Sequence, residues 1–197
     1  MAEILQSTKA DLRKVLRERM RGISDVARAE FSRRACEVAI GHLGLEAGSS
    51  VLLYMPLQGE VDVRLILDRA TARGCQVALP RFVPDQGKYA AFFIGGKPLV
   101  PGAFGALEPH DSMPVALNQL DLVVVPGLGF DLMGRRLGRG KGFYDRMLSE
   151  VSGVKCGVCF DEQIVAEIPA EPHDVSVDFL ATPTRWFDCR GATPHKQ

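Results

Sequence analysis

The sequence predicts an α/β fold in which a central, mostly parallel sheet has helices on both faces, in three layers α/β/α. Segments of helical periodicity alternate with short apolar segments. Most of the apolar segments are continuous, which is typical of strands buried on both faces. A chain of 197 residues with 46% apolar residues can form one well-cored domain, so we expect residues 1–188 to be a single domain. Residues 189–197 are expected to form a disordered tail.

The chain is expected to open with a helix over residues 7–21. Leu12, Val15, Leu16 and Met20 recur there at helical spacing, and the preceding Ser-Thr pair supplies an N-cap. Basic side chains lie on the other faces of this helix. In a chain with no net charge, such a local basic cluster suggests a small anionic ligand more than a polyanion.

The later elements alternate between strands and helices. SSVLLYMP at 49–56 is a continuous apolar run that ends in proline, and LDLVVVPG at 120–127 is the strongest strand of the chain. We also expect helices at 25–41, 62–74 and near 143–151, strands at 76–82, 88–96, 155–160 and 178–183, and an irregular connection at 97–119. In parallel sheets ligands bind beyond the carboxyl ends of the strands, so a site is expected after 49–56 and 120–127.

Composition excludes several classes of protein. Lys+Arg and Asp+Glu balance at 24 each, so we expect no nucleic-acid partner. The first residues lack the pattern of a signal peptide, and no apolar run approaches the ~20 residues of a membrane helix, so no membrane association is expected. Five cysteines make no disulfide framework in a chain of this size, and we expect a cytoplasmic monomer.

Cys156 and Cys159 form a CxxC pair. A zinc site would need a second pair of Cys or His ligands at close spacing, and the sequence offers none. A redox pair would lie at a strand-to-helix junction, whereas VKCGVCF is typical of a buried strand. We therefore expect two small core residues.

Residues 136–145, RLGRGKGFYD, concentrate glycine and positive charge directly after the most apolar strand. With Gly134, the glycines of this stretch imply a cost of about 2–4 kcal/mol relative to alanine, so some function must require this backbone. The spacing excludes a Walker A loop, because Arg135 stands where its first glycine belongs. It also excludes a dinucleotide fingerprint, because Phe143 stands where its third glycine belongs.

The alternating glycines nevertheless let backbone N–H groups turn toward one concavity, as in an anion-binding nest. Arg136, Arg139 and Lys141 add charged donors, and the helix expected after them adds its positive dipole end. The alternative is a basic surface loop that binds nothing. Asp145 can hold a Mg²⁺ that accompanies a nucleotide phosphate, or simply stabilise the start of the helix, and its position alone leaves both open.

The segment PGLGFDLMGRRLGRGKGFYDRML, residues 126–148, resembles the signature of the 5-formyltetrahydrofolate cyclo-ligase family. The resemblance covers nearly the whole chain, with matches at Lys9 and Arg13, at Met55–Glu60 and at Pro169–Asp178. One departure is Phe143, where the family usually has tyrosine, which keeps the ring but removes a hydroxyl.

The resemblance implies a single cyclo-ligase domain that uses ATP and Mg²⁺ to convert 5-formyltetrahydrofolate into 5,10-methenyltetrahydrofolate, ADP and phosphate. Phosphorylation of the formyl oxygen followed by attack of N10 would need mainly positioning and charge neutralisation. In agreement, no arrangement typical of nucleophilic catalysis stands out in the sequence.

The resemblance also implies roles for individual residues. The residues expected to bind ATP are Lys9, Arg13, Arg136, Leu137, Gly138, Arg139, Gly140, Lys141, Gly142, Phe143 and Tyr144, of which Arg136, Lys141 and Tyr144 are expected to be catalytic. The residues expected to bind the folate are Met55, Glu60, Phe104, Arg139, Gly140, Lys141, Gly142 and Phe143. Asp145 and Asp178 are the expected Mg²⁺ ligands, and His173 is expected to have no catalytic duty.

Two other functions fit parts of the pattern. A folate- or nucleotide-binding regulator without turnover would keep the pocket, but the retention of both candidate metal carboxylates with the basic residues argues against it. A sugar-phosphate or CoA-ester enzyme on a similar scaffold would use the glycine stretch for a substrate phosphate, and would need a catalytic carboxylate or histidine near the strand ends.

Overall fold

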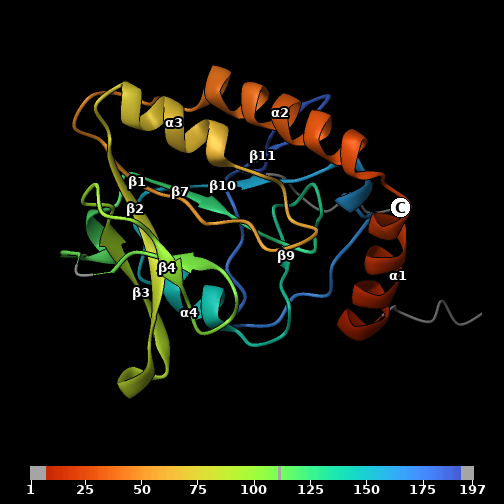
Figure 1. The fold of residues 1–197 in the computed structure, drawn as a ribbon. Coiled ribbons are helices and arrows are strands. Elements are labelled where there is room, and N and C mark those ends of the chain that lie inside the picture. Colours follow the sequence, from red (N-terminus) through yellow and green to blue (C-terminus); the bar gives the residue numbers. More distant parts are fainter. Residues whose placement is uncertain (1–7, 111, 192–197) are drawn as a thin grey trace, which may run out of the picture.

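A computed structural model describes residues 8–110 and 112–191, and an eight-stranded sheet runs through its centre in the order β12-β11-β10-β7-β1-β2-β3-β6 (Figure 1). The strands are β1 (Ser50–Leu52), β2 (Gln76–Val83), β3 (Lys88–Phe93), β6 (Pro114–Val115), β7 (Leu122–Val125), β10 (Val154–Val158), β11 (Phe179–Ala181) and β12 (Trp186–Asp188). The run from β2 through β1, β7 and β10 to β11 is parallel, and β3, β6 and β12 pair antiparallel at the two edges. The prediction of a mostly parallel sheet is confirmed.

Helices cover both faces of the sheet, as three layers require (Figure 1). The helices are α1 (Lys9–Arg21), α2 (Asp25–His42), α3 (Arg64–Ala72), α4 (Phe143–Leu148) and the 3₁₀ turns η1 (Pro84–Gln86), η2 (Leu117–Gln119) and η3 (Asp161–Gln163). Side chains alternate across the sheet along β7. Val124 packs in the same cluster as Ile66 of α3, whereas Val123 and Val125 pack with Leu148 of α4. This alternation explains why LVVV is apolar throughout.

Short strands occupy the segments that join the layers. They are β4 (Val100–Pro101) with β5 (Leu107–Glu108), and β8 (Gly129–Phe130) with β9 (Arg136–Leu137), each pair forming an antiparallel hairpin. The connection at 97–119, predicted to be irregular, therefore contains β4, β5 and β6. The β8–β9 hairpin folds the start of the glycine stretch back toward the sheet.

Helix α1 lies at the side of the sheet, where it reaches the glycine stretch (Figure 1). Thr8 caps it in a capping box with Asp11. Leu16 is fully buried in a small cluster with Leu137 of β9 and Ile168, whereas Val15, predicted to face inward, is 42% exposed. The apolar contact through Leu16 is thus what holds α1 against the hairpin that carries the glycine stretch.

The C-terminal boundary differs from the prediction. Cys189, which the sequence assigned to the tail, is buried, and its N–H donates to the carbonyl of Asp178 at 2.9 Å. The packed domain therefore extends at least to this residue, because a buried side chain and a backbone hydrogen bond hold it. Residues 192–197, the rest of the predicted tail, lie outside the described residues.

Cys156 and Cys159 are fully buried, and all five cysteines are free thiols. Burial raises the pKa of both thiols, which disfavours the reactive thiolate. The pair thus packs in the core on opposite faces of the sheet, since Cys156 belongs to the cluster under α2 and α3 and Cys159 to the cluster under α4. Within the described part of the chain, no helix combines the length and apolar character needed to cross a membrane.

Candidate functional site

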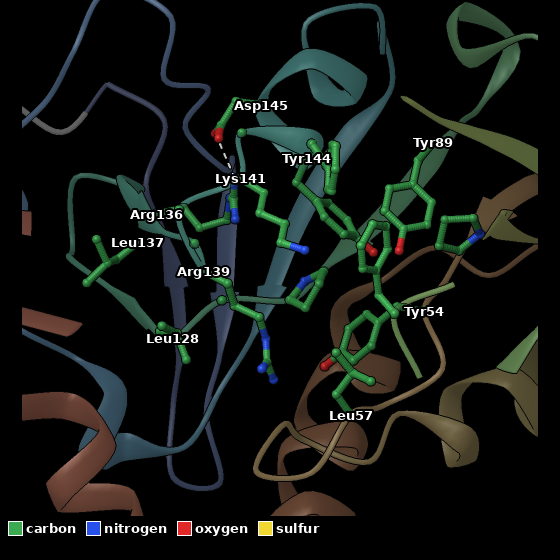
Figure 2. Close-up of a pocket in the computed structure, with 18 of the residues that line it drawn as sticks. Tyr54, Leu57, Tyr89, Leu128, Arg136, Leu137, Arg139, Lys141, Tyr144 and Asp145 are labelled. Atoms are coloured by element: carbon green, nitrogen blue, oxygen red, sulfur yellow. Dashed lines mark hydrogen bonds and ion pairs between the residues drawn. The ribbon is translucent and has the colours of Figure 1, made fainter. Parts of the chain in front are cut away.

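A cavity of about 550 Å³ opens beyond the carboxyl ends of β1 and β7, where parallel sheets bind their ligands (Figure 2). Its walls come from the segment after β1 (Tyr54 to Glu60), the glycine stretch, the N-terminal half of α1, the β4–β5 hairpin and the loop containing residues 171–174. Segments from both ends of the chain therefore meet at one place.

The turn that leads into the glycine stretch is built on Asp131, which is fully buried. Its Oδ1 accepts the N–H groups of Met133 and Arg135, both at 3.0 Å, and its Oδ2 accepts the N–H of Ile168 at 2.9 Å. Burial raises the pKa of the Asp131 carboxyl, and these backbone hydrogen bonds oppose that effect. Sequence reasoning assigned no role to Asp131, although an aspartate directly after a buried strand is a recognisable turn signal.

We expect Asp131→Ala to lower the free energy of unfolding by about 3–5 kcal/mol, because buried N–H groups would lose their acceptor. Urea denaturation followed by circular dichroism measures this change. Asp85→Ala is the matched control, since Asp85 is exposed in η1 and its replacement should cost less than about 0.5 kcal/mol. A loss below about 1 kcal/mol for Asp131→Ala would contradict the assigned role.

The glycines of the stretch are needed for two different reasons. Gly140 and Gly142 have φ values of +99° and +64°, in the left-handed region that favours glycine. Gly138 lacks space instead, because a Cβ there would lie 2.7 Å from Nη1 of Arg136. Helix α4 follows Gly142 but has only six residues. The helix dipole expected from the sequence therefore contributes less to anion binding than the basic side chains do.

Arg136 is the buried cation of the site, with a side chain only 4% exposed. Its Nη2 donates to Oδ1 of Asp145 at 2.6 Å, and its guanidinium lies 5.7 Å from the ring centre of Tyr144 (Figure 2). Its Nε has no hydrogen-bond partner among the described residues. Burial raises the pKa of Tyr144, so this phenol stays protonated at neutral pH and can act as a hydrogen-bond donor.

Arg139 and Glu60 join the glycine stretch to the segment after β1. The Arg139 guanidinium donates to Oε1 of Glu60 from Nη2 at 3.0 Å and from Nε at 3.2 Å. Oε2 of Glu60 accepts the N–H of Leu57 at 2.9 Å. Both oxygens of this carboxylate therefore accept hydrogen bonds from within the chain.

Helix α1 presents Lys9 and Arg13 to the cavity one turn apart, as their spacing predicted. Lys9 Nζ donates to Asp174 at 2.6 Å and to Glu171 at 2.8 Å, and Arg13 Nε donates to the carbonyl of Gly138 at 2.9 Å. Burial alone would lower the pKa of Lys9, but its hydrogen bonds to the two carboxylates raise it, so the ammonium remains charged.

An aromatic slot forms the opposite wall. We use this name for Phe82, Tyr89, Phe104 and Phe143, whose ring centres lie 5.0 Å (Phe82–Phe104) to 6.2 Å (Tyr89–Phe104) apart. All of them except Phe82 line the cavity. Nζ of Lys141 lies 3.9 Å from the ring centre of Phe104, so this lysine reaches from the glycine stretch toward the slot (Figure 2). Such a slot suits a flat ring next to a cationic group.

The candidate metal ligands are only partly brought together. Asp145 lines the cavity, whereas Asp178 does not. Asp178 directly precedes β11, so it lies at the amino end of a parallel strand, and its Oδ2 accepts the N–H of Lys155 at 2.7 Å. Its expected position at the site is therefore corrected. The carboxylates that face the cavity from this part of the chain are Glu171 and Asp174.

Every other residue that the sequence predicted for the site lines the cavity, from Lys9 to Asp145. Sequence reasoning missed Tyr54, Tyr89, Glu108, Glu171 and Asp174, which also line it. Glu171 and Asp174 lie in the segment that carried the resemblance, which was the available signal. Tyr89 and Glu108 gave none, because neither the strand expected at 88–96 nor the connection at 97–119 carries a recognisable motif.

Known proteins are similar to this chain over most of its length. The model of the 5-formyltetrahydrofolate cyclo-ligase family matches residues 5–183. A 5-formyltetrahydrofolate cyclo-ligase of Mycolicibacterium smegmatis is 33% identical over 186 residues, covering 90% of this chain and 95% of that protein. One from Mus musculus is 29% identical, covering 90% and 94%. The solved structure of a 5,10-methenyltetrahydrofolate synthetase from Aquifex aeolicus superimposes with a TM-score of 0.82 at 31% identity, covering 96% of both chains.

Proposed function

This chain belongs to the 5-formyltetrahydrofolate cyclo-ligase family, and from this premise we propose that its cavity binds ATP and 5-formyltetrahydrofolate side by side and forms 5,10-methenyltetrahydrofolate, ADP and phosphate. One observation carries the proposal: a basic glycine stretch and an aromatic slot share one cavity, and Lys141 spans the two. A nucleotide phosphate and a flat heterocycle are the ligands that such walls favour.

The chemical difficulty is that a formamide oxygen is a poor leaving group. Transfer of the γ-phosphoryl group to that oxygen releases ADP and leaves an imidate-like phosphate ester. N10 then attacks the formyl carbon, the C–O bond breaks, and phosphate departs while N10 loses its proton. Both steps need aligned reactants and neutralised negative charge rather than a protein nucleophile.

The phosphates would lie against Arg13 and the glycine stretch, with Arg136 and Lys141 beside the transferred group. Arg136 supplies a forked donor held in one orientation by Asp145. Lys141 neutralises charge at the boundary between phosphates and folate. Tyr144, kept protonated by burial, donates a hydrogen bond rather than accepting a proton.

The residues present fit a Mg²⁺ that arrives with ATP, because carboxylate oxygens are its preferred protein ligands. Among the described residues, Glu171, His173 and Asp174 each offer a ligand atom within 4.8 Å of the others. We propose Asp145 and Asp174 as the residues that hold the ion, with Asp174 in the place first assigned to Asp178. When bound, the ion would offset the charge of the phosphates.

The folate would stack its ring system on the aromatic slot where Phe104 and Phe143 line the cavity, as Met55 also does. Glu60 would accept N–H groups of the ring once Arg139 turns from it toward a phosphate. We propose a monomer as the active unit. Free thiols support the cytosol as the compartment, although a relative from Arabidopsis thaliana is named as mitochondrial.

The test is a direct assay. Purified protein mixed with 5-formyltetrahydrofolate, ATP and Mg²⁺ should develop the near-ultraviolet absorbance of the methenyl product, and one ADP should form per product. Omission of ATP or addition of a chelator should stop the reaction. Binding of both ligands without product would contradict the proposal and favour a regulatory binding protein.

A further inference from the structure

Glu108 is a buried carboxyl group in the wall of the cavity that has no role in the chemistry above. It ends β5, the second strand of the β4–β5 hairpin, and lines the cavity although only 6% of the residue is exposed. Burying a carboxylate costs free energy unless its oxygens receive hydrogen bonds. A buried carboxyl group beside a ligand cavity is therefore a candidate functional group.

The hydrogen bonds of Glu108 are incomplete. Burial raises the pKa of the Glu108 carboxyl group, and the backbone N–H of Phe82 of β2 and the charge of Arg81 oppose that rise. The Oε1 atom has no donor among the described residues. The carboxyl group packs directly on Gly102, where any Cβ would clash with it. The hairpin thus makes room for this side chain at the cavity wall and leaves one oxygen without a partner.

Glu60, the carboxylate proposed above for the folate ring, can offer an oxygen only when Arg139 turns away from it. Its two oxygens already accept the N–H groups of Arg139 and Leu57. A reduced pterin offers several N–H donors, namely the 2-amino group, N3–H and N8–H, and each must find an acceptor when the ring leaves water. Glu108 is a buried carboxylate of the cavity wall, and among the described residues its Oε1 has no donor.

We propose that Glu108 is a recognition residue for the folate ring, and that its carboxylate accepts N–H donors of the reduced pterin. This inference rests on the proposed function. Glu108 lies beside the aromatic slot, because β5 packs against β2, which carries Phe82, and Glu108 and Tyr89 line the same cavity. In agreement, the charge of Glu108 adds to burial in raising the pKa of Tyr89 to about 12. A ring held in that slot would have its polar edge next to Glu108. Rotation about the last torsion of a glutamate side chain is broad, so the spare oxygen can turn from Gly102 toward the ligand.

The test compares a ligand that has the ring with one that lacks it. In Glu108→Gln the shape is kept and the charge is lost, so the Kd of 5-formyltetrahydrofolate, measured by calorimetry without ATP, should rise about tenfold or more. The Kd of p-aminobenzoylglutamate, which has no pterin, and the KM for ATP should change less than twofold. The KM for the folate should rise while kcat stays within threefold.

Glu150→Gln is the matched control, because Glu150 is exposed and does not line the cavity. Gly102→Ala is a second variant that displaces the carboxyl group without removing its charge, and it should also weaken binding of the folate selectively. An unchanged folate Kd in Glu108→Gln would overturn the inference. So would an equal loss for the folate, the fragment and ATP, which would indicate a structural role. If the unmodified protein fails to bind 5-formyltetrahydrofolate at all, the proposed function itself fails.

Discussion

Replacing Arg136 by lysine should lower kcat/KM for the ATP-dependent cyclisation about 10²–10³-fold, the size of effect seen when one preorganised donor to a developing charge is lost. Arg136 is almost fully buried, and Asp145 holds its guanidinium through a 2.6 Å hydrogen bond. Lysine keeps the charge but replaces the planar fork by a single flexible ammonium. The transferred phosphoryl group would then lose one of the two N–H donors that the guanidinium fork offers.

Steady-state kinetics with 5-formyltetrahydrofolate and ATP measure this effect, and thermal melting shows whether the fold survives. Arg135→Lys is a matched control at the neighbouring position. The Arg135 side chain pairs with Glu167 and does not line the cavity, so activity should stay within about threefold of the unmodified protein. Equal activities of the two variants would exclude a role of Arg136 in the reaction.

Lys141→Met should reduce kcat about 10²–10³-fold while the fold remains stable. Lys141 is exposed, and no carboxylate forms an ion pair with it among the described residues. Its charge is thus available to phosphates that approach the aromatic slot. Methionine is about as long as lysine and its side chain is apolar. Packing against Phe104 is therefore kept, and only the charge is removed.

Lys88→Met is the control for Lys141, since Lys88 is an exposed lysine at the start of β3 and does not line the cavity. Its activity should be unchanged. If Lys141→Met raises the KM for ATP but leaves kcat intact, Lys141 only holds the nucleotide and does not stabilise the transferred group. Single-turnover measurement of the methenyl absorbance separates these two outcomes.

Much of the fold could be predicted because local patterns decide it. The continuous apolar run of β7 predicted a strand buried on both faces, and Val123 and Val124 do pack against opposite layers. Gly140 and Gly142 were correctly singled out, because a backbone with positive φ leaves its mark as glycine. The two-residue strands β4, β5, β6, β8 and β9 were missed, because so short a segment has no periodicity and pairs only when the rest of the fold presents a partner.

The candidate metal site shows most clearly what the sequence alone could not predict. The sequence places Asp174 and Asp178 four residues apart, and nothing in the spacing says which of them faces the cavity. Asp178 lies at the amino end of β11, where its carboxylate accepts the N–H of Lys155, while Asp174 lines the cavity and accepts a hydrogen bond from Lys9.

By itself, the sequence determined the layer order, the glycine stretch and the cationic residues around it, because each depends on neighbours within a few positions. Only the tertiary structure decided which carboxylates meet those cations and that Glu108 stands beside the aromatic slot. Those contacts join segments far apart in the chain, such as Lys9 with Asp174 and Arg139 with Glu60. Contacts of this kind depend on how the loops beyond the strands pack together, which no local pattern records.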